Sequence, residues 1–164
     1  MQSLPILVLT TGGTIDKNYF DALSEYQIVD SGIPALLKEA RVALPFRVEE
    51  VCRKDSLELT DADRAELVRR VAEAPETQIV ITHGTDTMTE TAKALAGIPG
   101  KTIVLTGALS PARFAETDAP FNLGMAFAAA QVAPPGVYIA MSGQVFDGLR
   151  VRKDRAAGRF VGLG

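Results

Sequence analysis

Short apolar runs that alternate with longer helical patterns are the feature that most constrains the fold of this chain. The runs are too short for helices and rich in β-branched residues, which is typical of buried parallel strands. They span residues 4–9, 78–81, 101–106 and 137–141, with a further predicted strand at 46–51. Helical patterns lie between them, at 33–40, 60–74, 87–96 and 121–132. This alternation predicts an α/β fold: a three-layer, mostly parallel sheet with helices on both faces.

Capping signals mark the start of two predicted helices. Thr60 and Asp61 precede the amphipathic pattern at 60–74, and Thr87 with Glu90 matches a capping box before the next helix. The segment 12–30 shows no sustained periodicity and predicts a long loop. A loop of that length in a compact domain is usually functional or mobile.

Length and charge narrow the class of protein. With 164 residues, of which 47% are hydrophobic, we expect residues 1–164 to form a single flavodoxin-like or Rossmann-like domain. The net charge is −3 and the 17 basic residues are scattered, which argues against nucleic acid as a partner. The densest basic stretch, 150–155, is typical of a solvated surface segment.

Cysteine usage and targeting signals bear on location. Cys52 is the only cysteine, so neither a disulfide nor a cysteine metal site can form within one chain. The sequence starts without the basic region of a signal peptide, and no apolar run approaches transmembrane length. We therefore predict a cytoplasmic protein that does not associate with membranes.

Two threonines follow the apolar runs at 4–9 and 78–81, and each comes directly after a glycine. Thr14 lies in the segment TGGTI at 11–15, and Thr85 lies in HGTDTM at 83–88. Because ligands bind at the carboxyl edge of open α/β sheets, we expect both hydroxyls to face one pocket.

Each motif by itself has a structural alternative. Gly12 and Gly13 could simply form a strand-to-loop turn, and the glycine spacings of nucleotide-phosphate loops are absent. Asp86 could be an ordinary helix cap. A threonine hydroxyl attacks a carbonyl only if a base takes its proton, and a lysine kept neutral by burial could do so.

Taken together, the two motifs resemble the bacterial-type L-asparaginase family, which hydrolyses the side-chain amide of asparagine. The resemblance covers nearly the whole chain. The other matching segments are 24–26, 55–56, 106–108, 120–123 and 147–153.

The resemblance implies a role for each catalytic residue. Thr14 would attack the amide carbonyl, with Tyr26 near its hydroxyl, to give an acyl-enzyme and release ammonia. Thr85, Asp86 and Lys153 would form a second triad that activates water, although this triad could instead support the first attack. Each of two residues has an alternative to its catalytic role: Tyr26 could anchor a loop, and Lys153 could be solvated like its neighbours.

The resemblance also implies a substrate pocket. Gly13, Asp55 and Ser56 would line it together with Thr85 and Asp86, with Ser56 binding the substrate α-carboxylate and Asp86 the α-amino group. Ser56 could alternatively cap a turn. No metal or organic cofactor is implied, and the only histidine, His83, is expected to be structural.

The sequence departs from the family at two places. Leu57 occupies a position where a polar residue commonly helps to hold the amine, and the carboxy-terminal domain of longer members is absent from this sequence. We expect weak substrate affinity and a homo-oligomer. The leading hypothesis is an L-asparagine amidohydrolase. The alternatives are an amidase for glutamine or D-asparagine and a non-catalytic amino-acid-binding module.

Overall fold

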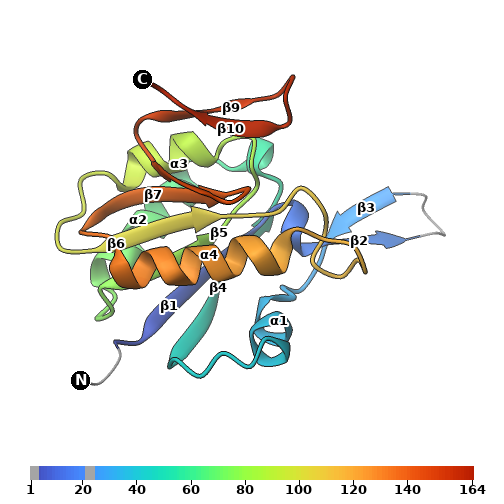
Figure 1. Ribbon diagram of the computed structural model, residues 1–164, viewed down its shortest axis with the longest axis horizontal. Helices are drawn as coiled ribbons and strands as arrows, with labels where there is room; N and C mark the ends of the chain where they lie inside the picture. Colours follow the sequence, from blue (N-terminus) through green and yellow to red (C-terminus); the bar gives the residue numbers. More distant parts are fainter. Residues whose placement is uncertain (1–3, 21–24) are drawn as a thin grey trace.

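The structure is a computed structural model that describes residues 4–20 and 25–164, with only the backbone described at 19 and 20 (Figure 1). Its first half contains β1 (Ile6–Gly12), the 3-10 turn η1 (Thr14–Asp16), β2 (Lys17–Phe20), β3 (Glu25–Ile28), α1 (Ile33–Glu39), β4 (Phe46–Lys54), the 3-10 turn η3 (Ser56–Glu58) and α2 (Asp61–Glu73). Its second half contains β5 (Gln78–Thr82), α3 (Met88–Leu95), β6 (Thr102–Thr106), α4 (Ala119–Val132), β7 (Gly136–Met141), β8 (Gln144–Asp147), β9 (Val151–Asp154) and β10 (Arg159–Gly162).

A six-stranded sheet in the order β4-β1-β5-β6-β7-β8 forms the centre of the molecule. The first five strands are parallel, and β8 runs antiparallel to β7 at one edge. The helices α2 and α3 cover one face and α1 and α4 the other (Figure 1). The predicted α/β class with helices on both faces is therefore confirmed. No helix within 4–20 and 25–164 is long and apolar enough to span a bilayer.

Each face of the sheet has its own apolar core. Because side chains alternate along a strand, β1 directs Leu7 and Leu9 towards one core and Ile6 and Val8 towards the other. The first core also takes in Val151 and Phe160 from the β9–β10 hairpin, which anchors that hairpin against the α2–α3 layer. This anchoring decides where the segment 151–154 lies.

Two hairpins lie where no strand was predicted from the sequence. The predicted loop at 12–30 contains the β2–β3 hairpin, in which Lys17 pairs with Ile28 and Phe20 with Glu25. The basic stretch at 150–155 contains β9, paired with β10. Neither segment shows a clear alternation of apolar residues. These hairpins are stabilised more by backbone hydrogen bonds between their strands than by burial of one face, so they need no such alternation. Residues 21–24, which include Ser24 of the matched segment 24–26, lie outside the described residues.

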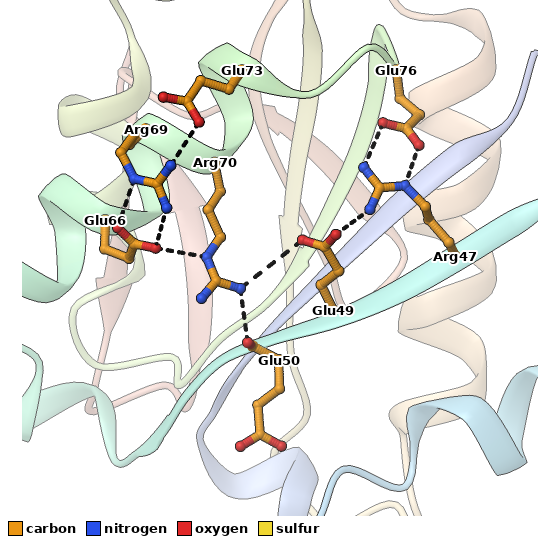
Figure 2. A network of polar contacts seen from close by, with 8 residues as sticks. All are labelled: Arg47, Glu49, Glu50, Glu66, Arg69, Arg70, Glu73 and Glu76. Carbon is orange, nitrogen blue, oxygen red and sulfur yellow. Dashed lines mark hydrogen bonds and ion pairs between the residues drawn. The ribbon is translucent and has the colours of Figure 1, made fainter.

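The exposed edge strand β4 is joined to α2 and its following turn by a network of ion pairs (Figure 2). Arg47 binds Glu76 through two hydrogen bonds, from Nε to Oε1 (2.5 Å) and from Nη2 to Oε2 (3.0 Å). Arg70 donates to the carbonyl of Glu50 on β4, at 2.9 Å. Charged side chains on an edge strand also discourage edge-to-edge aggregation. The network comprises Arg47, Glu49, Glu50, Glu66, Arg69, Arg70, Glu73 and Glu76.

Glu66 in this network makes the free energy of unfolding depend on pH in the acid range. Hydrogen bonds from Arg69 (2.7 Å) and Arg70 (2.8 Å) lower the pKa of Glu66 from 4.5 to about 2. Because the folded-state pKa is depressed, the contribution of Glu66 is present above about pH 4.5 and is lost as the pH falls towards 2. We expect Glu66→Gln to lower the urea midpoint slightly at pH 7 and to flatten its decline between those pH values.

The matched control for this measurement is Glu39→Gln, an exposed carboxylate on α1 outside the network. It should leave the pH profile of the urea midpoint unchanged. Equal slopes for the wild type and Glu66→Gln below pH 4.5 would contradict the role of these ion pairs.

Candidate active site

Two glycine turns touch at the carboxyl edge of the sheet. Gly13 follows β1 with φ +81°, and a Cβ placed on it would lie 2.4 Å from the backbone nitrogen of Gly84, which follows the neighbouring strand β5. The two backbones are therefore in direct contact. Thr14 and Thr85, the next residue in each turn, are brought to the same edge, as expected from the order of the strands.

A third turn, η3, packs against the same place. A Cβ on Gly84 would lie 2.7 Å from the Cβ of Ser56, which is 1% exposed. The Ser56 hydroxyl accepts a hydrogen bond from the amide of Thr87 (3.3 Å), and the Thr87 hydroxyl donates to the Ser56 carbonyl (2.8 Å). The structure thus places the predicted carboxylate-binding serine next to the Thr85 turn.

Asp55, the neighbour of Ser56, is paired with a cation from the β2–β3 hairpin. Lys17 Nζ donates to Asp55 Oδ2 at 2.9 Å. Burial alone would raise the pKa of Asp55, but the hydrogen bond and charge of Lys17 outweigh it and lower that pKa below its usual value. Asp55 therefore ties η3 to the hairpin base.

Lys153 reaches this edge from the opposite end of the chain. Its Nζ donates to Thr85 Oγ1 at 2.7 Å and to Asp86 Oδ1 at 2.8 Å, and its side chain is only 18% exposed. Figure 1 shows the β9–β10 hairpin lying over α3, and the two hydrogen bonds direct the Lys153 side chain from β9 to the residues just before that helix. Arg155 is 67% exposed and 3.7 Å from Asp86. The alternative in which Lys153 is solvated like its neighbours therefore does not hold.

Tyr26 lies on the β2–β3 hairpin, which Figure 1 shows projecting beyond the sheet. Its side chain is 53% exposed, and its ring centroid is 6.1 Å from that of Phe114. The hairpin follows η1, the turn that begins with Thr14. Tyr26 therefore lies on a different element from both the Thr14 turn and the Thr85 cluster, and the ring contact that the structure gives it is with Phe114.

Asp16 fixes the base of that hairpin and was missed by sequence reasoning. Its Oδ1 accepts hydrogen bonds from the Ser31 hydroxyl (3.0 Å) and the Gly32 amide (3.1 Å). Burial raises the pKa of this carboxyl above its usual value, although both hydrogen bonds oppose the change. Its position two residues after Thr14 was the only available signal, because its partners lie fifteen and sixteen residues further along the chain.

The predicted capping box before α3 does not form. The Thr87 hydroxyl makes no capping bond, because it donates to Ser56 and accepts from Arg64 Nη2 (2.9 Å). The tertiary partners of Thr87 thus replace its local one. In α2, by contrast, Thr60 does cap the helix, and its capping box is completed by Asp63.

Comparisons with known proteins agree with this arrangement. Residues 5–160 match the family model described as Asparaginase, N-terminal. The L-asparaginase of Thermococcus kodakarensis is 34% identical over 165 residues, covering 94% of this chain and 49% of that protein. The glutaminase-asparaginase of Pseudomonas fluorescens biotype A is 31% identical over 166 residues, covering 90% of this chain and 45% of that protein.

Solved structures give the same result. The thermostable L-asparaginase from Thermococcus kodakarensis superposes with a TM-score of 0.85 at 30% identity, over 97% of this chain and 51% of that one. The chain spans about half the length of the curated relatives it matches. The matched segment contains both threonine turns and Lys153, and the chain belongs to the asparaginase family by its match to the N-terminal domain of that family.

Proposed function

We propose that this chain hydrolyses the side-chain amide of L-asparagine to L-aspartate and ammonia. The observation that carries the proposal is the contact of Lys153 Nζ with both Thr85 Oγ1 (2.7 Å) and Asp86 Oδ1 (2.8 Å). This cluster joins an amine, a hydroxyl and a carboxylate; once the amine has given up a proton it can act as the base that an activated nucleophile or water requires. Family membership supports the same reaction class.

In the proposed first step, Thr14 Oγ1 bonds to the amide carbon and the C–N bond breaks. The hydroxyl proton of Thr14 passes to the leaving nitrogen, which departs as ammonia, and Tyr26 assists from the hairpin. In the second step, water attacks the acyl carbon, the ester bond to Thr14 breaks, one water proton returns to Thr14 Oγ1, and the other leaves with the product carboxyl group, which ionises. Thr85 and the Lys153 amine, in its neutral form at this step, relay that proton, while Asp86 holds the substrate α-amino group. These groups alone balance the reaction, and no cofactor is proposed.

Substrate positioning is assigned to the turns around Gly84. Asp86 would bind the α-amino group, and Ser56 the α-carboxylate, with Gly13 and Asp55 completing the wall of the pocket. Because Ser56 is 1% exposed, binding has to uncover its hydroxyl. Its proton is available for a carboxylate, since the Ser56 oxygen already accepts the Thr87 amide.

An ammonia-release assay with L-asparagine over micromolar to tens-of-millimolar concentrations tests this function. We expect turnover that is lost in Thr14→Ala and in Thr85→Val. Glutamine and D-asparagine are assayed as alternative substrates. A higher kcat/KM for either one would identify that amide, and not L-asparagine, as the preferred substrate. Full activity in both variants would refute the mechanism. Tight binding of aspartate without turnover of any amide would favour a binding module instead.

We also propose that the protein works in the cytoplasm as a homo-oligomer. Leu57, next to Ser56, is 66% exposed, and Leu149, near the Lys153 hairpin, is 47% exposed. Apolar side chains beside a site are suited to cover by another subunit. Sedimentation velocity with and without aspartate measures the state of association.

A further inference from the structure

Arg64, in the first turn of α2, is a largely buried cation that the proposed mechanism does not use. Its side chain is 12% exposed. The guanidinium donates from Nε to Thr91 Oγ1 (3.0 Å), from Nη2 to Thr87 Oγ1 (2.9 Å) and from Nη1 to the Leu59 carbonyl (3.3 Å). Its only carboxylate contact among the described residues is Glu90, at 3.5 Å and 62% exposed. Its contacts are therefore directed mainly inward, at two threonine hydroxyls.

The chemistry of arginine fixes the direction of these hydrogen bonds. A guanidinium only donates, so both threonine oxygens act as acceptors towards it and each keeps one proton to give elsewhere. Thr87 gives its proton to the Ser56 carbonyl (2.8 Å). The oxygen of Thr91 lies 2.7 Å from His83 Nε2.

The protonation of His83 follows from its other neighbour. Nδ1 lies 2.6 Å from the Gly84 carbonyl, which can only accept, so Nδ1 carries the proton. His83 is fully buried, and burial lowers its pKa to about 4, which leaves the ring neutral at pH 7. Nε2 is then an acceptor, and the Thr91 hydroxyl donates to it. Protonation of Nε2 would instead direct two donors at the Thr91 oxygen.

The other titratable groups around His83 already have partners. Asp63 and Cys52 line the same narrow space as His83, which is too small for a water molecule. Asp63 is bonded to Lys54 (2.8 Å), and the Cys52 thiol donates to a β1 carbonyl (3.4 Å). The charge of Arg64 adds to the lowering of the His83 pKa. Arg64 is thus the group on α2 that bears on the state of the ring.

We propose that Arg64 is a positioning residue that clamps two turns of the active site together. Through Thr91 it holds His83 in the Nδ1–H form, which fixes the Gly84 carbonyl just before Thr85. Through Thr87 it holds the Ser56 turn. The two turns are in van der Waals contact, because a Cβ on Gly84 would lie 2.7 Å from that of Ser56. The planar guanidinium of Arg64 directs one donor at Thr91 and another at Thr87 in a fixed geometry, which a lysine ammonium cannot do.

The state of His83 tests the clamp independently of activity. His83 is the only histidine of the chain, so a ¹H–¹⁵N long-range NMR spectrum reports its ring directly. We expect the Nδ1–H form at pH 7 in the wild type. In Arg64→Met the pKa of His83 should rise, because a positive charge and the donor that orients Thr91 are lost. An Nε2–H form in the wild type, or an unchanged titration in folded Arg64→Met, would overturn the proposal.

The expected effect of Arg64 on catalysis rests on the proposed function. It is tested by removing the contact through Thr91 and the contact through Thr87 separately. Thr91→Val should lower kcat with little change in KM, and Thr87→Val should mainly raise KM. Arg64→Met should combine both effects and reduce kcat/KM by up to about 100-fold, the scale expected for a displacement of about 1 Å. A loss of thermal stability without this split would show a merely structural role and refute the proposal.

Two further variants complete the design. Arg64→Lys keeps the charge but not the planar guanidinium, so it should lose kcat/KM while its His83 pKa stays low, and it carries the test if Arg64→Met does not fold. Arg69→Met, on the exposed side of α2, is the matched control and should match the wild type in both measurements. Absence of ammonia release by the wild type would refute the proposed function, and the NMR result would still decide whether the clamp exists.

Discussion

Replacing Lys153 by methionine is expected to lower kcat for L-asparagine by about 10²- to 10⁴-fold, the usual contribution of a general acid or base. Methionine retains an unbranched apolar stem of similar length but has no amine. The Thr85 hydroxyl would lose the group that lies 2.7 Å away, and among the described residues the cation left beside Asp86 would be the more distant Arg155, at 3.7 Å. Initial rates of ammonia release measure the effect.

The control for this variant is Arg152→Met on the same strand. Arg152 is exposed, whereas the Lys153 side chain is 18% exposed, so the control removes a neighbouring charge without touching the cluster. It should leave kcat within about twofold, as is usual for an exposed side chain outside a site. Equal rates for Lys153→Met and Arg152→Met would show that Lys153 takes no part in proton transfer.

Gly13→Ala is expected to damage the site and the fold together. Gly13 has φ +81° and ψ −176°, a region that is essentially restricted to glycine and costs another residue about 1–3 kcal/mol. The added methyl group would also lie 2.4 Å from the nitrogen of Gly84, so one of the two turns has to move. We expect a lower urea midpoint and, from the displacement of the turns, a loss of kcat/KM of about 100-fold.

Gly124→Ala is the matched control for the second experiment. Gly124 lies inside α4, and nothing lies within 4 Å of a Cβ placed on it. Alanine in a helix interior is favoured over glycine by about 0.5–1 kcal/mol, so this variant should be equally or more stable and fully active. A Gly13→Ala protein as stable and active as Gly124→Ala would contradict the close contact between the two turns.

Much of the sheet and of its helices could be predicted from the sequence. The apolar runs at 78–81 and 137–141 became β5 and β7, and the amphipathic pattern at 60–74 became α2 with Thr60 as its cap. These elements follow from local periodicity, which the sequence displays directly. The proximity of Thr85, Asp86 and Lys153 was also expected, on the strength of a family resemblance and not of any local rule.

The hairpins and the polar contacts behind the site could not be predicted in this way. The β2–β3 hairpin has little apolar alternation, and Asp16 acts through partners fifteen or more residues away. Thr87 matched a capping box, yet its hydroxyl bonds to Ser56 and Arg64 instead. A capping pattern describes what a hydroxyl can do locally, and a better partner from another element overrides it.

The sequence by itself determined the five parallel strands, the four helices and the two turns that end in threonines, because these depend on periodicity and on glycine at short range. Only the tertiary structure decided that Lys153 is turned inward while Arg152 is exposed, and that Arg64 is directed at Thr87 and Thr91. Both outcomes depend on packing between elements far apart in the chain: Val151 and Phe160 anchor one hairpin, and α2 lies against α3. Burial makes such polar side chains find partners, and the fold determines which partners are within reach.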